Sequence, residues 1–205
     1  MYTLVRWFRR LMLLRKAMVV FGLLGAGGGA YVGIPHIQQA LAQPSEAKVQ
    51  ASGEMTVGFS PGNAEALVVD VIKRAAKGGS LEVAAYEFTS KPVAEAILAA
   101  HRRGVRVRVV VDQERLSGKY NAGTYLANNN VPLRASNPRY KIFHHKFVIV
   151  DGKTLQTGSF NYTTAAAKSN AENVLVMWDA PAVAAVYAKE FERIWMESQD
   201  AKQKY

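Results

Sequence analysis

The stretch from His144 to Asn161, HHKFVIVDGKTLQTGSFN, constrains the fold more than any other part of the chain. Its apolar run FVIV is typical of a buried strand, Asp151-Gly152 of a hairpin turn, and LQTGS of the returning strand. Side chains on a strand alternate between its two faces, so residues two apart share a face. The stretch therefore predicts a β-hairpin with polar side chains at its open end.

These polar side chains form a chemically coherent set. By strand alternation His144 and Lys146 share one face of the first strand, and Ser159 and Asn161 share one face of the second. If the two faces coincide, an imidazole, an ammonium, a hydroxyl and an amide converge on one pocket. That set suits a phosphodiester, because it offers a nucleophile, a cation and neutral donors for the non-bridging oxygens. The open end of the hairpin is therefore a candidate catalytic site.

The spacing of six residues in this stretch resembles the signature of the phospholipase D superfamily. The six are His144, Lys146, Asp151, Gly158, Ser159 and Asn161, in the pattern H-x-K-x4-D-x6-G-S-x-N. Within that superfamily the chain resembles in particular the small, single-motif bacterial endonucleases, which are secreted proteins of similar length. The resemblance covers roughly Glu54 to Gln199, and it is more specific for the superfamily than for the substrate.

The resemblance implies a reaction that uses neither a metal ion nor a cofactor. One motif histidine attacks phosphorus to form a phosphohistidine, a second protonates the leaving oxygen, and water then hydrolyses the intermediate. His144 would be the nucleophile or the acid. Lys146 and Asn161 would bind non-bridging oxygens, and Ser159 would line the pocket. Glu172 matches the downstream acidic position whose carboxylate bonds to the histidine and sets its tautomer.

Three further residues near the motif are candidates with other roles. Asp151 completes the signature, but alternation places it on the opposite face from His144, which indicates an ion pair or a turn-stabilising bond. Arg139 and Lys141 flank Tyr140 and lead directly into the motif, so they are candidates for substrate binding. A basic and aromatic approach to the pocket favours nucleic acid, with ordinary surface residues as the alternative.

The segments around the motif predict an α/β fold with a mixed, largely parallel sheet flanked by helices on both faces. Besides the hairpin, strands are expected at 54–60, 81–88, 105–111, 131–135 and 171–178, and helices at 63–77, 91–103, 121–129 and 181–198. The βαβαβαβ order of the segments before the hairpin favours parallel strands joined by crossover helices.

Residues 1–42 have the three-part layout of a secretory signal peptide and are not expected to belong to the fold. Basic residues come first, an uncharged and mostly apolar stretch spans 17–34, and an Ala-Leu-Ala cleavage pattern ends at Ala42. The alternative is an uncleaved membrane anchor, because the 18 residues of that stretch reach the lower edge of spanning length. We therefore expect a periplasmic or secreted protein, or else one anchored by residues 17–34.

After the leader, we expect a flexible lead-in at 43–53, a single phospholipase D-like catalytic domain at 54–199 and a tail at 200–205. Five of the 26 basic residues and none of the 16 acidic ones lie in 1–42, so the remainder carries 21 basic against 16 acidic residues, a net charge of +5. This balance is compatible with a polyanionic substrate. The chain has no cysteine, which excludes disulfides, cysteine-based zinc sites and thiol catalysis.

The function favoured by these observations is a metal-independent phosphodiesterase, a non-specific endonuclease acting on DNA or RNA. A phospholipase D acting on phospholipid head groups is the alternative, although the chain has no long apolar insertion to admit acyl chains. A non-catalytic nucleic-acid-binding module is a third hypothesis, and the complete motif argues against it.

The chain carries one copy of the motif, whereas the implied mechanism needs two histidines. A two-fold axis would supply the second histidine from a second copy of the chain. We therefore expect a homodimer in which one active site is shared.

Overall fold

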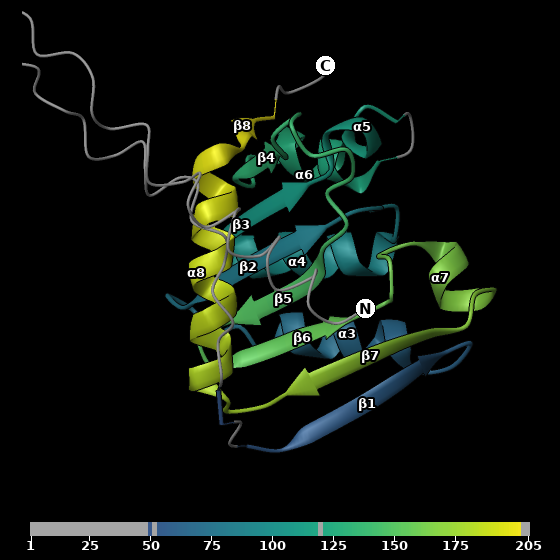
Figure 1. Ribbon diagram of the computed structural model, residues 1–205, viewed down its shortest axis with the longest axis vertical. Coiled ribbons are helices and arrows are strands. Elements are labelled where there is room, and N and C mark those ends of the chain that lie inside the picture. Colours follow the sequence, from purple (N-terminus) through teal and green to yellow (C-terminus); the bar gives the residue numbers. More distant parts are fainter. Residues whose placement is uncertain (1–48, 51–52, 119–120, 202–205) are drawn as a thin grey trace, which may run out of the picture. The chain divides into compact units, whose positions relative to one another are not determined.

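Eight strands form one sheet in the computed structural model of the chain, in the order β1-β7-β6-β5-β2-β3-β4-β8 (Figure 1). The strands are β1 (Met55–Ser60), β2 (Ser80–Ala85), β3 (Arg106–Val111), β4 (Leu133–Ala135), β5 (Lys146–Val150), β6 (Thr154–Gly158), β7 (Glu172–Met177) and β8 (Gln199–Asp200). The structure describes residues 49–50, 53–118 and 121–201. The predicted leader at 1–42 lies outside the described residues.

The sheet is mixed, as predicted, but the prediction that it is largely parallel was wrong. Only the pairs β2–β3 and β3–β4 are parallel, and the five other pairings of the sheet are antiparallel. The segment order suggested that β1 and β2 are parallel neighbours. Although α3 (Ala64–Lys73) connects them as expected, β1 and β2 are not neighbours, and β1 pairs with β7 at the outer edge of the sheet. Strands β7, β6 and β5 lie between β1 and β2. They pair with one another in antiparallel fashion, as the tight β5–β6 hairpin requires.

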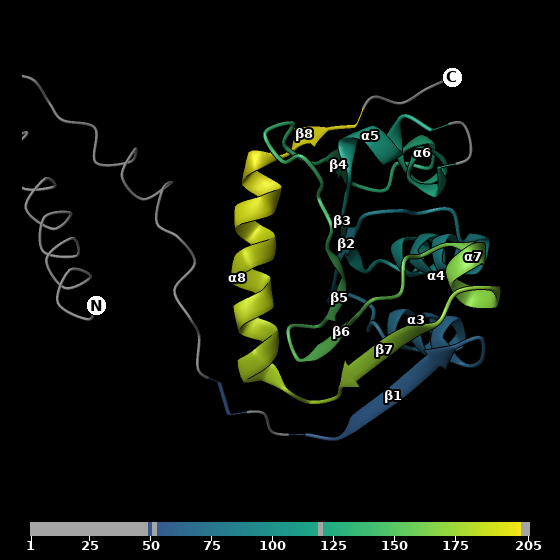
Figure 2. The same ribbon diagram turned by 45° about the vertical axis from the view of Figure 1, so that its right-hand side comes forward.

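Helices cover both faces of the sheet, as predicted (Figure 2). On one face lie α3, α4 (Lys91–Arg102) and α6 (Ala122–Asn128), and on the other lies α8 (Pro181–Glu197). A hydrophobic core lies on each face of the sheet, and the central strand β5 contributes side chains to both. Val148 packs in the core on the side of α3 and α4, and Phe147 packs with residues of α8. The strand that carries the motif is therefore buried on both faces.

The predicted segments are present, with ends displaced by a few residues. The helix expected over 63–77 ends at Lys73, and the strand expected to reach residue 88 ends at Ala85. Three elements were not predicted: α5 (Gln113–Leu116), α7 (Thr164–Lys168) and β8. Strand β8 includes Asp200, the first residue of the predicted tail, which pairs with Arg134 of β4.

Within the part of the chain that the structure describes, no helix is both long enough and apolar enough to cross a lipid bilayer.

Candidate active site

The ends of five strands meet at one edge of the sheet. Strand β5 begins there, β6 ends there and β7 begins there. The parallel strands β2 and β3 run opposite to β5, so their carboxyl ends lie at this same edge. Residues directly before or after these strand ends are therefore brought together although they lie far apart in the sequence.

His144 and Lys146 lie side by side at this edge and both contact Tyr86. His144 lies two residues before the start of β5 and is exposed, whereas Lys146, the first residue of β5, is only 7% exposed. The Lys146 ammonium donates a hydrogen bond of 2.9 Å to the backbone carbonyl of His144 and lies 5.2 Å from the centroid of the Tyr86 ring. The imidazole of His144 lies against the same ring, with centroids 4.7 Å apart. Burial lowers the pKa of Lys146, and the negative charges of Glu172 and Glu87 oppose that shift.

Ser159 and Glu172 form a second part of the site. The Ser159 hydroxyl donates a hydrogen bond of 2.5 Å to Oε2 of Glu172, and the side-chain amide of Asn170 donates one of 3.0 Å to Oε1. The sequence predicted a bond from Glu172 to His144. Among the described residues this carboxylate bonds to Ser159 and Asn170 instead, and it therefore orients the hydroxyl rather than the imidazole.

Gly158 allows the chain to turn into the site after β6. Its φ is +156°, and a Cβ at this position would lie 2.2 Å from the carbonyl oxygen of Asn173, so a side chain cannot be accommodated. The same carbonyl accepts a hydrogen bond of 3.1 Å from the backbone N–H of Ser159. The glycine of the motif is therefore needed for the close approach that places Ser159 beside β7.

Asn161 follows on this segment, and its side-chain oxygen is buried without a hydrogen-bond partner among the described residues. The next residue, Tyr162, is fully buried and holds the segment in place, because its hydroxyl donates to Gln156 at 2.8 Å and its carbonyl accepts from the N–H groups of Thr89 and Ser90. A buried polar atom without a partner costs about 1–3 kcal/mol. Such an atom at a binding edge can be satisfied by a substrate or by the proton donor of the reaction.

Asp151 lies at the opposite end of β5 from His144 and is not part of the site. Its carboxylate accepts hydrogen bonds from the backbone N–H groups of Ala76, at 3.1 Å, and Ser80, at 2.9 Å. These bonds tie the β5–β6 turn to the loop that leads into β2. Although it belongs to the motif, Asp151 stabilises a turn. This agrees with the expectation from strand alternation that Asp151 does not share a face with His144.

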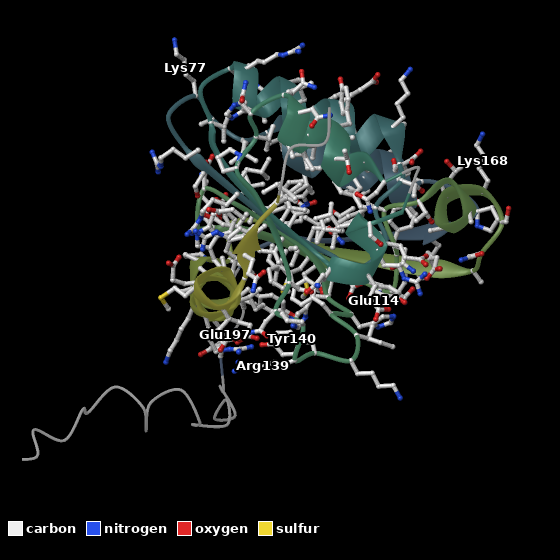
Figure 3. All side chains as sticks on the ribbon, turned by 90° about the horizontal axis from the view of Figure 1, so that it is seen from above. Lys77, Glu114, Arg139, Tyr140, Lys168 and Glu197 are labelled. Carbon is white, nitrogen blue, oxygen red and sulfur yellow. The ribbon has the colours of Figure 1, made fainter. Side chains whose placement is uncertain are left out.

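Arg139 and Tyr140 lie beside Glu197 of α8, as Figure 3 shows. The carboxylate of Glu197 pairs with Arg139 at 2.5 Å and accepts a hydrogen bond of 2.7 Å from the Tyr140 hydroxyl. Arg193 donates to both Tyr140 and Glu197. The predicted substrate contact of Arg139 thus competes with an existing ion pair, whereas Lys141 is exposed.

Sequence reasoning missed Tyr86, Asp112 and Arg115. The carboxylate of Asp112 accepts from the N–H groups of Glu114 and Arg115 at the start of α5, and from the N–H of Phe143 at 2.9 Å, just before His144. Tyr86 and Asp112 directly follow β2 and β3. Residues that directly follow the parallel strands of an α/β sheet lie at its ligand-binding edge, and this rule could have identified both.

The assembled edge can perform nucleophilic chemistry on a phosphate. It presents an exposed imidazole, a cation held next to it, and hydroxyl and amide groups on the neighbouring segment. Within residues 49–50, 53–118 and 121–201, no three or more histidine or acidic side chains are grouped so as to hold a metal ion.

Comparison with known protein families finds one match over most of this fold. The family described as "Cardiolipin synthase, PLD-like domain" matches residues 68–195. Among curated proteins, mitochondrial cardiolipin hydrolase of Xenopus laevis is 42% identical over 118 residues, which are 58% of this chain and 55% of that protein. Phospholipase D of Rickettsia felis is 33% identical over 119 residues, 58% of each chain. The chain thus spans about half the length of the curated relatives it matches.

Solved structures show the same architecture. The crystal structure of Nuc from Salmonella typhimurium, described as a phospholipase D family member, has a TM-score of 0.69 and 37% identity, covering 73% of this chain and 98% of that one. NucT from Helicobacter pylori has a TM-score of 0.63 and 21% identity, covering 72% of this chain and 100% of that one, a likeness that concerns the fold alone.

Proposed function

Because this chain belongs to the phospholipase D superfamily of phosphodiesterases, we propose that it hydrolyses nucleic acid through a covalent intermediate on His144. The observation that carries the proposal is the contact of His144 with Lys146 and Tyr86 at the open edge of the sheet. An exposed imidazole at a sheet edge suits an endonuclease, because a scissile phosphate within a strand has chain on both sides and must be reached from an open surface.

In the proposed first step, a ring nitrogen of His144 attacks phosphorus. A P–N bond forms, a P–O bond breaks, and the leaving oxygen takes a proton from a second histidine. Lys146 offsets the charge on the non-bridging oxygens, the side-chain N–H of Asn161 donates a hydrogen bond to one of them, and Ser159 is held at the pocket wall by Glu172. In the second step water attacks the phosphohistidine and gives up a proton to the second histidine, which restores both side chains.

The nuclease activity is expected to resist chelators. The groups assigned to attack and to charge balance are all protein side chains, so removing divalent metal should leave the rate within about twofold. Plasmid nicking by the full chain in excess EDTA measures this. Complete loss of nicking, with recovery on adding a divalent metal, would contradict the metal-independent mechanism.

The proposal includes a homodimer with one shared active site. Of the described histidines, His101 lies at the end of α4, and His145 packs between Phe143 and Phe147, so neither is placed to act as the second histidine. A two-fold axis beside His144 would bring a second His144 to the same phosphate, one neutral to attack and one protonated to donate.

Mixing wild-type and His144→Asn subunits tests the shared site. Every mixed dimer would lack one of the two histidines, so activity should fall as the square of the wild-type fraction. Differently tagged subunits would establish that the chains have exchanged. A linear fall after complete exchange would mean that each subunit carries a whole site, and the shared-site proposal would have to be abandoned.

Hydrolysis of phospholipid is the second candidate function. It is favoured by the curated relatives, whose names state that they hydrolyse cardiolipin or are phospholipase D. The chemistry on the phosphate would be the same. Cleavage of a single-stranded oligonucleotide compared with release of product from cardiolipin vesicles separates the two, and activity confined to the vesicles would replace the nuclease proposal.

A further inference from the structure

Arg115 is held over the same tyrosine that contacts the catalytic histidine. Its guanidinium carbon lies 4.9 Å from the centroid of the Tyr86 ring, and its Nε donates a hydrogen bond of 3.0 Å to the Tyr86 hydroxyl, which also accepts from Nη2. His144 also contacts Tyr86, and the centroids of the two rings are 4.7 Å apart. Arg115 and His144 therefore contact the same aromatic ring.

The guanidinium of Arg115 retains capacity for a ligand. The side chain is 48% exposed, and its contact with Glu87 is 3.6 Å long, beyond hydrogen-bond distance. In the described structure its hydrogen bonds go to Tyr86 from Nε and Nη2, which leaves the N–H groups of Nη1 for a further acceptor. A guanidinium already fixed by one partner loses less conformational entropy when it binds another.

A surface hollow of about 400 Å³ lies directly beside Arg115. Its walls come from Glu87 and Thr89 after β2, from Arg115 on α5, and from Thr163 and Thr164, just after Asn161. The hollow is therefore lined by the segment that follows Tyr86 and by the segment that follows Asn161, both of which also supply residues to the candidate active site. A volume of this size is within the range of pockets that hold small-molecule groups.

We propose that Arg115, held by Tyr86, binds the phosphate that neighbours the scissile phosphate, with the group between them directed toward the hollow. The inference rests on the proposed phosphodiesterase function and specifies its substrate. Successive phosphates of a nucleic-acid strand are joined through three ribose carbons, an O–C–C–C–O bridge. Cardiolipin joins its two phosphates through the three carbons of a glycerol, which is the same bridge. The subsite therefore selects substrates that carry two phosphodiesters one such bridge apart.

Substrates with one and two phosphates test this inference. The full chain would be assayed on a single-stranded oligonucleotide and on bis(p-nitrophenyl) phosphate, and on vesicles of cardiolipin and of phosphatidylglycerol. The variants are Arg115→Met, Arg115→Lys and Tyr86→Phe. Arg74→Met is the matched control, because Arg74 also stacks on an aromatic ring, Trp178 at 4.3 Å, and pairs with an acid, Asp70 at 2.9 Å, but lies near Asp151 at the opposite edge.

Arg115→Met should lower the ratio of kcat/KM on the oligonucleotide to kcat/KM on bis(p-nitrophenyl) phosphate by about ten- to a hundredfold, the loss expected for charge-assisted bonds to a phosphate. Arg115→Lys should recover part of that ratio. Tyr86→Phe should lower it less than Arg115→Met, since the ring remains but the acceptor that fixes Arg115 is lost. Arg74→Met should leave the ratio unchanged.

An unchanged ratio in Arg115→Met would overturn the inference. If both activities fall equally, Arg115 acts on His144 through Tyr86, and if neither falls, Arg115 does not contribute to the reaction. Failure of the nuclease proposal is distinguishable. If the wild-type chain cleaves cardiolipin but not the oligonucleotide, the nuclease proposal fails, and the ratio for cardiolipin over phosphatidylglycerol in Arg115→Met decides the inference. Inactivity of the wild type on both two-phosphate substrates would overturn both.

Discussion

Replacing His144 with asparagine is expected to lower turnover by ~10⁴-fold or more, the scale found when an enzyme loses its nucleophile. The imidazole is exposed, and its described contact is with the ring of Tyr86, so the fold should survive its loss. Asparagine is polar and of similar size, but it has no nucleophilic ring nitrogen. The measurement is kcat of the purified variant on an oligonucleotide, together with its thermal unfolding.

His145→Asn is the matched control for this experiment, because it makes the same change one residue along the chain. The ring of His145 packs edge-on against Phe143 and Phe147, and Nε2 lies 3.9 Å from the carboxylate of Glu190. Burial lowers the pKa of His145, which favours its neutral form in this cluster. The control should lose some stability and keep most of its turnover.

Near-normal turnover of His144→Asn, or capture of a phosphorylated protein from that variant, would show that His144 is not the nucleophile.

The main features of the fold could be predicted from the sequence because they depend on local patterns. Valines alternate along β3, which is typical of a strand, and Pro92 lies in the first turn of α4, where proline is favoured. Unlike the positions of the strands, the order of the strands in the sheet cannot be read from local patterns, because it depends on pairing between segments far apart in the sequence. Nothing local in β1 indicates that its partner is β7, more than a hundred residues later, so the direction of most pairings could not be predicted.

The site could be predicted in part, and the limit is where strand alternation stops. His144 and Lys146 were placed together correctly, since Lys146 begins β5 and His144 lies just before it. Beyond Gly158 the chain leaves the extended conformation, so alternation says nothing about which group Ser159 meets. Its partner is Glu172, which was expected to bond to the histidine. Tyr86 and Arg115 come from other strands and loops, and only the register of the sheet brings them to the motif.

Replacing Lys146 with methionine is expected to lower turnover by ~10²–10³-fold, as when a single preorganised charge-stabilising group is removed from an active site. Methionine has a similar length and no charge, so it fills the space of a side chain that is 7% exposed. Lys153→Met is the matched control: Lys153 lies at the opposite end of the hairpin, is exposed, and pairs loosely with Asp179 at 3.5 Å. Its loss should leave turnover within about twofold, as for an exposed ion pair.

The same Lys146→Met change is expected to leave stability at pH 7 unchanged or to raise it. Burial lowers the pKa of Lys146 in the folded chain below the 10.5 of an exposed lysine, so the charged form is disfavoured by folding. Between the two pKa values the unfolded chain binds more protons than the folded one, and wild-type stability therefore rises with pH in that window. Thermal unfolding should show the variant gaining most at neutral pH, with the gain shrinking as pH approaches 10.

Activity should depend on pH in the opposite direction. The wild-type enzyme needs the charged form of Lys146, so kcat/KM should fall on the alkaline side at a pH below 10.5, and this limb should be absent from Lys146→Met. A lysine that costs stability while the reaction requires its charge is kept for chemistry rather than for folding. A variant that loses stability at pH 7 and retains turnover would reverse that assignment and make Lys146 a structural residue, whose role would be its hydrogen bond to the carbonyl of His144.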